Sequence, residues 1–346
     1  MPPNTAYSSR LGVIEDHQFA DAVRKAGLGE FISASPVSGG LFGQNVFLIT
    51  TSGDYVFRGA PHWFQGKAND AWQFPKERFY ADLLHSDTSA SVAWPQHLND
   101  SCEDFPWPYL IMPRLPGVCL SDPADRAALS DADALEIAEA LSRTLVDLQS
   151  LRRDHAGDFD PDVKALVPYP GGYAQHLRTE IENQAAAARL NQSFTAEDDN
   201  WLADLFATDA EQASESTLAT FVHNDYHLGN VLLERANTGW RVSGVIDLMT
   251  CNFGDPATDL VRQSCDWLDR APLCAQAYLD VYRQAEGRAN PTPARLALLV
   301  AYERLLIWSY FTRPEVAHPA FKRQTFRGWA EPYCQRLSKI WFDGSR

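Results

Sequence analysis

The sequence lacks the marks of an exported or membrane-embedded chain. Its first residues form no basic segment followed by an apolar run, and no later stretch offers about 18 uninterrupted apolar residues. Cysteine is also scarce, with six residues in 346 and no Cys-x-x-Cys pair, so neither a zinc ribbon nor a disulfide scaffold is indicated. We therefore expect a soluble, cytoplasmic protein with reduced thiols and no membrane partner.

Positive charge is the second shortage. The chain has 30 Lys and Arg against 45 Asp and Glu, a formal net charge of −15. Nucleic acids and anionic membranes are polyanions, so this balance disfavours both as partners. It is compatible with a cationic substrate, although acidic enzymes are common and net charge mainly reports solubility.

Apolar periodicity indicates a sheet-rich first part. Phe79, Leu83 and Leu84 share one face of a helix that is expected to begin at Pro75 and end near Ser86. The other expected elements of this part are a helix over 16–27, an antiparallel meander of strands near 32–37, 46–50 and 55–57, and two strands near 92 and 109–112.

The pattern changes after Pro113 and Pro116-Gly117. Helical spacing dominates the remainder, beginning with a long amphipathic helix over 135–148, and the exceptions are strands near 221–222, 231–233 and 242–246. A length of 346 residues and a hydrophobic content of 45% suffice for two cores. We expect an α+β fold with an N-lobe over 1–115, a hinge near 113–116 and a mainly helical C-lobe over 116–346.

The strongest chemical signal lies in the second part. Residues 223–230 read HNDYHLGN, and residues 245–247 read Val-Ile-Asp. Asp225 can orient a hydroxyl or accept its proton, while Asn230 and Asp247 offer the hard oxygen ligands that Mg²⁺ prefers. The two strands between them read as a hairpin, which would return Asp247 to Asn230. The pattern predicts phosphoryl transfer.

These residues, together with the 254–260 segment GDPATDL, resemble the aminoglycoside phosphotransferase family, whose relatives include choline kinases and other small-molecule kinases. Residues 108–117 resemble the hinge of that family and residues 77–84 its N-lobe helix, so the likeness runs through nearly the whole chain. It implies a protein-kinase-like bilobal fold. It also implies Mg²⁺-dependent transfer from ATP, or GTP, to a hydroxyl of a small molecule.

The resemblance assigns roles in the C-lobe residue by residue. It implies that Asp225 is the catalytic Asp and that Asn230 and Asp247 are the Mg²⁺ ligands. His223 and Asp259 correspond to structural residues that brace the catalytic loop.

In the N-lobe, the resemblance implies that Arg58 contacts the α- and β-phosphates and that Glu77 pairs with it. Lys is common at the position of Arg58, and the two cations are not interchangeable, so Arg58 is a departure from the family pattern. At the hinge, matching places the Pro113 carbonyl and the Leu115 amide against the nucleobase edge.

A glycine-containing loop lies between two of the predicted strands. Backbone amides at Ser38, Gly39 and Gly40 can approach phosphate closely because no bulky side chains intervene. A flexible hairpin turn is the plain alternative for such a loop, and the downstream motifs favour the phosphate-binding interpretation.

An acidic run precedes and includes the catalytic loop. Residues 190–234 contain no Lys or Arg and nine acidic residues, at positions 197, 198, 199, 204, 209, 211, 215, 225 and 234. The run suits a cationic acceptor, and the family resemblance implies that this is a hydroxylated compound such as an aminoglycoside, with a role in antibiotic resistance; a solvated helix face is the alternative for the run. Other antibiotics, amino alcohols and sugars remain open as acceptors.

Two hypotheses of other classes remain. His223, Asp225 and His227 alternate along the chain and could be metal ligands of a hydrolase, which would leave Asn230 and Asp247 without a role. A catalytically inactive kinase fold could serve as a binding module, although such proteins usually lose the catalytic Asp or a metal ligand, and this sequence keeps all three residues.

Overall fold

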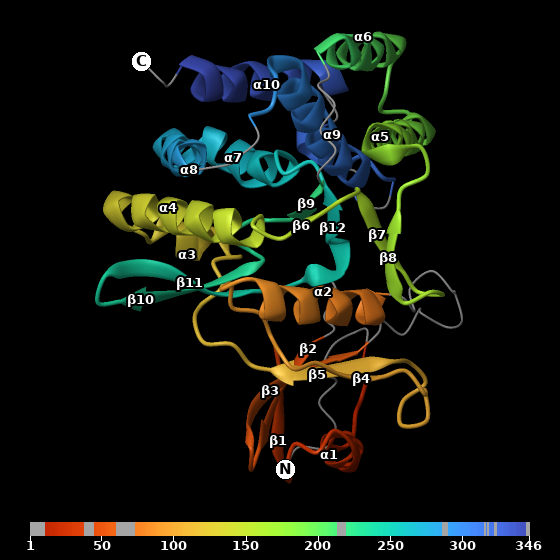
Figure 1. The fold of residues 1–346 in the computed structure, drawn as a ribbon, viewed down its shortest axis with the longest axis vertical. Helices are drawn as coiled ribbons and strands as arrows, with labels where there is room; N and C mark the ends of the chain where they lie inside the picture. Colours follow the sequence, from red (N-terminus) through yellow and green to blue (C-terminus); the bar gives the residue numbers. More distant parts are fainter. Residues whose placement is uncertain are drawn as a thin grey trace.

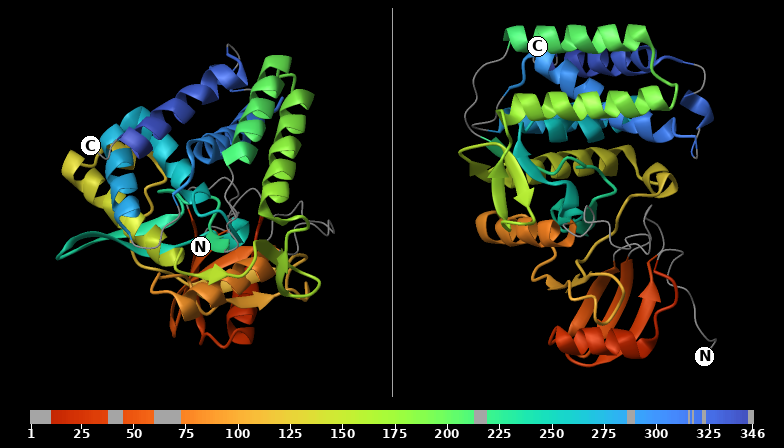
Figure 2. Two further views of the ribbon diagram at one scale, coloured as in Figure 1. Left: turned by 45° about the horizontal axis from the view of Figure 1, so that its top comes forward. Right: turned by 90° about the vertical axis from the view of Figure 1, so that its right-hand side faces the viewer.

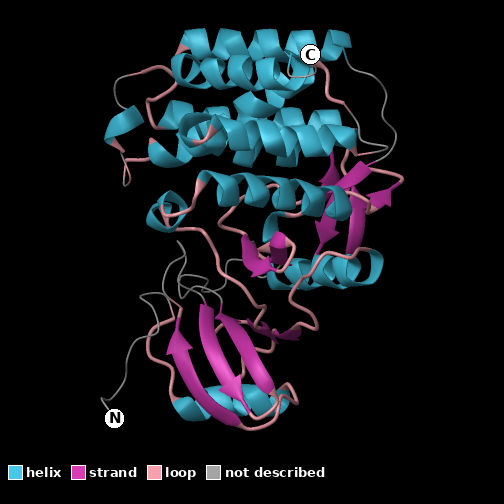
Figure 3. Ribbon diagram, turned by 90° about the vertical axis from the view of Figure 1, so that its left-hand side faces the viewer, coloured by secondary structure: helices cyan, strands magenta, loops and turns pink. Residues whose placement is uncertain are grey.

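The computed structural model describes residues 11–37, 45–59, 73–212, 219–285, 290–314, 316, 318–321 and 324–343. A sheet-rich part lies at one end of the molecule and layers of helices lie at the other (Figures 1 and 3). None of the helices in these ranges combines the length and the apolar character needed to cross a bilayer. The arrangement is the expected protein-kinase-like α+β fold.

The N-terminal part is a five-stranded antiparallel sheet with one helix against it. The helix α1 (Asp16–Lys25) and the meander are confirmed. The sheet has the order β1 (Phe31–Pro36), β2 (Asn45–Thr50), β3 (Gly53–Gly59), β5 (Tyr109–Pro113) and β4 (His97–Asn99). The strand expected near Val92 is wrong, since Val92 forms only an isolated bridge to Val245, and the edge strand is the short β4 instead.

Strand periodicity decides which way Arg58 points. Side chains alternate between the two faces of a strand, and the register pairs Val46 with Phe57. Both are fully buried in the core that α1 covers, where Phe19 meets Phe57 edge-on with ring centroids 5.3 Å apart. Arg58 follows Phe57 and therefore lies on the opposite face of the sheet.

The helix α2 (Gln73–Asp87) lies between this sheet and the helical part (Figure 1). It begins two residues before Pro75, and of its expected apolar face only Leu84 is fully buried. Phe79 and Leu83 are partly buried, whereas Lys76 and Glu77 are buried because both have ionic partners. Apolar periodicity therefore predicted the helix and the face that packs against the core, but not the burial of Lys76 and Glu77.

The C-terminal part consists mainly of stacked helices (Figure 2). The expected long helix is present, packed among buried leucines. The helices are α3 (Pro123–Ala127), α4 (Asp131–Leu148), α5 (Gly172–Leu190), α6 (Ala196–Gln212), α7 (Thr258–Arg270), α8 (Pro272–Gln284), α9 (Pro293–Phe311), α10 (Phe326–Asp343) and the 3-10 turns η2 (Leu248–Thr250) and η3 (Pro319–Phe321).

Two small sheets carry the loops of the C-terminal part. The expected hairpin is confirmed, with Val231 of β10 (Val231–Ala236) opposite Val245 of β11 (Gly239–Val245). The second sheet has the order β6 (Arg152–Arg153), β9 (Ala219–Val222), β12 (Asn252–Gly254), β7 (Gly157–Asp160) and β8 (Ala165–Pro168). Of these five only β9 was expected, because strands of two to four residues show almost no periodicity. The lobe boundary between residues 115 and 116 stays a prediction.

Candidate functional site

The loop over 223–230 connects β9 to β10, and Asp259 fixes its start. The backbone amides of His223 and Asn224 donate to Asp259 Oδ2 and Oδ1 at 2.7 and 2.8 Å. Asn224 has a φ of +65°, a left-handed conformation that Asn tolerates, and its side chain donates to the Thr250 carbonyl at 2.7 Å. Burial raises the pKa of Asp259 to about 7, against these two amide donors.

His223 links the loop to the end of β11. Its ring is fully buried, and Nε2 lies 3.0 Å from the Ile246 carbonyl, a contact that requires the proton on Nε2. Burial lowers the pKa of His223, so the ring is neutral. With Nε2 occupied by a carbonyl, His223 gives the hydrolase hypothesis no support, and the described residues hold no cluster of three His, Cys, Asp or Glu placed for a metal ion.

Asp225 stands in the middle of the loop with three partners. The Asn230 amide donates to its carbonyl and to Oδ2, both at 2.9 Å, while His227 Nε2 and Arg262 Nε lie 3.4 and 3.5 Å from Oδ1. Gly229 N donates to His227 Nδ1 at 3.0 Å, which leaves the His227 proton on Nε2 facing Asp225.

These partners keep Asp225 ionised. Burial opposes the charge, but the hydrogen bond from His227 and the positive charge of Arg262 outweigh it and hold the pKa of Asp225 well below its usual range. The side chain is 36% exposed, so it can meet a ligand. A carboxylate in this state can orient a hydroxyl, and positioning dominates in phosphoryl transfer.

The hairpin places Asp247 beside Asn230, as the sequence predicts. Ile246 N donates to the Asn230 carbonyl at 3.0 Å, and Asp247 follows with a φ of +64° and a side chain 34% exposed. The amide nitrogen of Asn230 is committed to Asp225, which directs its oxygen elsewhere. One amide oxygen and one carboxylate form a donor set that suits a hard cation, so these residues fit Mg²⁺.

Arg58 joins the two parts of the molecule at this point. Its Nη1 lies 3.1 Å from Glu77 Oε1, which is the pair expected from the sequence, and its Nη2 lies 3.1 Å from Asp247 Oδ1. Burial raises the pKa of Glu77 to about 7, against the opposing charge of Arg58. A planar guanidinium can face two carboxylates through separate nitrogens.

The hinge register bears on the proposed nucleobase contacts. Arg114 N donates to the Asp54 carbonyl at 3.0 Å, so the neighbouring pair of Tyr55 and Pro113 is a non-hydrogen-bonded one. The Pro113 carbonyl therefore points away from β3, and Leu115 is partly buried against the core of this part. Their contacts with a nucleobase stay predictions, and Ser38, Gly39 and Gly40 lie outside the described residues.

Two side chains of this site were not predicted from the sequence in these roles. His227 was considered only as a metal ligand, yet it contacts Asp225. Arg262 on α7 reaches Asp225 and is itself held by the buried Glu303 of α9, with Nη1 2.8 Å from Oε1. The available signal was spacing, since Arg262 lies one helical turn after Asp259.

The structure changes the interpretation of the acidic run. Arginines from outside 190–234 pair with five of its nine acidic residues, in the pairs Glu197–Arg327, Asp199–Arg189, Asp209–Arg295, Asp225–Arg262 and Glu234–Arg241. A sixth, Asp198, is buried and accepts the amides of Thr195 and Arg327. The run is therefore largely neutralised by folding, which its own composition could not show.

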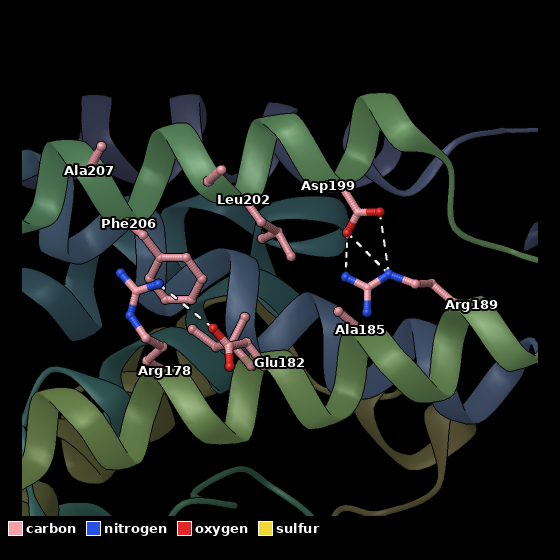
Figure 4. Close-up of a pocket in the computed structure, with 10 residues that line it drawn as sticks. Arg178, Glu182, Ala185, Arg189, Asp199, Leu202, Phe206 and Ala207 are labelled. Carbon is pink, nitrogen blue, oxygen red and sulfur yellow. Dashed lines mark hydrogen bonds and ion pairs between the residues drawn. The ribbon is translucent and has the colours of Figure 1, made fainter.

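A hollow between α5 and α6 lies apart from these residues (Figure 4). Arg178 stacks over Phe206 at 4.2 Å on one side of it, and Arg189 pairs with Asp199 on the other. None of the catalytic-loop residues lines it. The hollow is not the place where the loop chemistry occurs.

A kinase-like fold with this loop, a following Asp and an N-lobe cation defines a phosphotransferase. Residues 33–299 match the profile of the phosphotransferase enzyme family, and the chain belongs to that family. Its reaction class is that of a small-molecule kinase with a hydroxyl acceptor. No curated protein sequence matches the chain.

Solved structures share the fold over nearly the full chain. A protein of Ralstonia eutropha JMP134 described as a candidate aminoglycoside phosphotransferase is 19% identical, with a TM-score of 0.64, and the alignment covers 95% of this chain and 98% of that one. A thermostable mutant of APH(4)-Ia with AMP-PNP and hygromycin B is 17% identical (TM-score 0.58, 92% and 97% covered). APH(2")-IIIa with GDP and kanamycin is 16% identical (TM-score 0.60, 94% and 98% covered).

Proposed function

We propose that the protein transfers the γ-phosphoryl group of ATP or GTP, with Mg²⁺, to a hydroxyl of a cationic small molecule such as an aminoglycoside. The observation that carries this proposal is the convergence of Asp225, Asn230, Asp247 and Arg58 from three separate segments of the chain: the loop over 223–230, the end of β11 and the strand β3. The family membership supports the reaction class, and the retained carboxylates argue against an inactive binding protein.

In the proposed mechanism Asp225 accepts a hydrogen bond from the acceptor hydroxyl and then its proton. Arg262 and His227 keep this carboxylate ionised and in place. Asn230 and Asp247 would hold Mg²⁺, which when bound neutralises charge on the phosphate oxygens. The Nη2 of Arg58 would leave Asp247 and contact the phosphates, while its Nη1 stays paired with Glu77.

The nucleotide would occupy the space between the two parts. Neighbours of the same fold are known with AMP-PNP, ADP and GDP, which supports a nucleoside phosphate donor. The Pro113 carbonyl and the Leu115 amide would meet the nucleobase edge, and Ser38, Gly39 and Gly40 the phosphates. These assignments rest on the family pattern.

The proposed acceptor follows the ligands of the neighbours, hygromycin B and kanamycin. Both fit the net charge of −15, since an acidic protein attracts cations. A cytoplasmic role in antibiotic resistance would follow from this acceptor. Amino alcohols, sugars and other antibiotics are the alternatives.

A nucleotide-turnover screen tests the proposal. Aminoglycosides, amino alcohols and neutral sugars would be assayed with Mg²⁺ and ATP or GTP at low and high salt, with Asp225→Asn as the blank. For a cationic acceptor the KM should rise with salt, because charges are screened over about 8 Å at physiological ionic strength. Preference for a neutral acceptor, insensitive to salt, would refute the cationic acceptor only; no turnover above the blank would refute the kinase.

A further inference from the structure

A second ion pair, formed by a buried lysine and a partly exposed aspartate, lies one residue away from Glu77. Lys76 Nζ is 2.6 Å from Asp158 Oδ2, and the Lys76 side chain is 3% exposed. Tyr80, also on α2, donates its hydroxyl to the other oxygen of Asp158 at 3.1 Å. Asp158 belongs to β7, so both contacts tie α2 to the small sheet of the C-terminal part, beside which α2 lies (Figures 1 and 2).

Helix geometry makes these contacts a directional constraint. Lys76 and Tyr80 are four residues apart and share one face of α2, which is the face turned to Asp158. Glu77 is the next residue, about 100° further round the helix, and it faces Arg58. A rotation of α2 about its axis, or a slide along it, that keeps the Lys76–Asp158 pair would break the Glu77–Arg58 pair, and the reverse.

Packing around the pair supports the same position of the helix. Phe79 meets Phe159 of β7 with ring centroids 5.1 Å apart, and Tyr80 is fully buried with its ring 6.1 Å from that of Phe253 on β12. Burying an ammonium is costly unless it is paired. Lys76 therefore strongly favours the one placement of α2 in which its ammonium meets Asp158.

We propose that Lys76 and Asp158 are positioning residues of the nucleotide site. By fixing α2 against β7, they hold Glu77 where it can pair with Arg58, and Arg58 where it reaches Asp247 and the phosphates. The pair touches neither substrate nor metal and acts through Glu77. This inference rests on the proposed function of Arg58 and Glu77, and on the contacts of Asp158, which that function does not require.

The test uses the full-length protein, three single variants and the double variant of Lys76→Met with Asp158→Asn. Lys76→Met keeps a linear side chain in the buried position, and Asp158→Asn keeps an acceptor for Tyr80 without the charge. Asp104→Asn is the matched control, because Asp104 also receives a lysine and a tyrosine, Lys25 and Tyr109, but none of its hydrogen-bond partners lies on α2.

Affinity for Mg²⁺ with AMP-PNP, and for Mg²⁺ with GDP, would be measured by calorimetry. We expect about tenfold weaker binding in Lys76→Met and in Asp158→Asn, no further loss in the double variant, and wild-type affinity in Asp104→Asn. Amide exchange of Gln73–Asp87 without nucleotide should become faster in the first two variants only.

The outcomes separate the two proposals. Unchanged nucleotide affinity in Lys76→Met and Asp158→Asn, or an equal loss in Asp104→Asn, would overturn the positioning role. A wild-type protein that binds neither nucleotide would instead refute the proposed function, and the exchange of α2 would still decide whether the pair fixes the helix. Unchanged amide exchange of α2 in Lys76→Met and Asp158→Asn would also refute the claim that the pair fixes the helix.

Discussion

Two carboxylates of the same site are driven in opposite directions. Asp225 is 36% exposed, and although burial opposes its charge, His227 and Arg262 hold its pKa well below the usual range. Glu77 is 3% exposed and pairs with Arg58, which it shares with Asp247, and burial raises its pKa to about 7. The number of donors around a carboxylate, set against its burial, decides which one titrates near neutral pH.

The difference assigns separate tasks to the two groups. Asp225 stays ionised through the whole neutral range, as its proposed role toward the acceptor hydroxyl requires. Glu77 changes its charge near pH 7, so the strength of its ion pair with Arg58 depends on pH. Environments that push two acids apart in this way are typical of catalytic sites.

The largest effect is expected when Asp225, the ionised member of the two carboxylates, loses its charge. Asp225→Asn keeps the size of the side chain but removes the charge that orients the hydroxyl, and kcat should fall by about 10²–10⁴. Nucleotide affinity should hardly change, because Arg58, Asn230 and Asp247 remain. Steady-state kinetics measures the fall in kcat, and calorimetry measures the nucleotide affinity. Wild-type turnover in this variant would remove Asp225 from the mechanism.

The second effect concerns Asn230 and Asp247, the proposed metal ligands. Asp247→Ala should weaken Mg²⁺-dependent nucleotide binding by roughly 10–100-fold, and Asn230→Ala by less, because only the carboxylate supplies charge. Calorimetry with and without Mg²⁺ measures how much of the nucleotide affinity depends on the ion. If both variants keep the wild-type dependence on Mg²⁺, neither residue is a ligand of the ion.

The catalytic loop and its hairpin could be predicted because their determinants are local. Asp225, Asn230 and the strands that return Asp247 lie within 25 residues of one another along the chain. Turn residues and alternating apolar positions predict that the two strands pair, although Asp259 also fixes the start of the loop. The same holds for α4, whose buried stripe runs from Ile137 to Leu148.

The remainder depends on contacts that no local pattern encodes. Arg58 and Asp247 are 189 residues apart, and the arginines that neutralise the acidic run come from outside it. The buried face of α2 includes Lys76 and Glu77, which a search for apolar residues places on the surface. Burial of a charge can be predicted only once its partner is known.

The third prediction removes the titrating carboxylate of Glu77. Its pKa in the fold is raised to about 7, so the ionised pair with Arg58 is present above that pH and is lost as the pH falls through it. Nucleotide kcat/KM should therefore drop by about tenfold for each unit of pH well below 7. Glu77→Gln should be low and flat over the same range.

A pH–rate profile of both proteins makes the measurement. If Glu77→Gln retains the wild-type acid limb, the titrating group is a different one. Asp259 is the candidate, because burial raises its pKa to about 7 as well and it holds the catalytic loop through two amides.

The smallest effect is expected where Asp225 loses its cationic neighbour Arg262 and its pKa moves in the direction of that of Glu77. Arg262→Gln removes the charge 3.5 Å from Oδ1, while Arg304 remains beside Glu303, so that buried carboxylate is not left unpaired. An ion pair about one-third exposed is worth about 0.2–1 kcal/mol, so kcat should fall by up to about fivefold. The pKa of Asp225 should rise toward the usual range, and any acid limb it causes should move to higher pH.

Arg143→Gln is the matched control, because Arg143 forms an exposed pair with Glu139 on α4 that contacts none of the site residues. It should leave both kcat and the pH profile unchanged. A fall of more than about a hundredfold in Arg262→Gln would exceed what the loss of this pair can cause and would mean that Arg262 contacts the transferred phosphoryl group itself. An unaltered profile would mean that His227 and Asn230 alone keep Asp225 ionised.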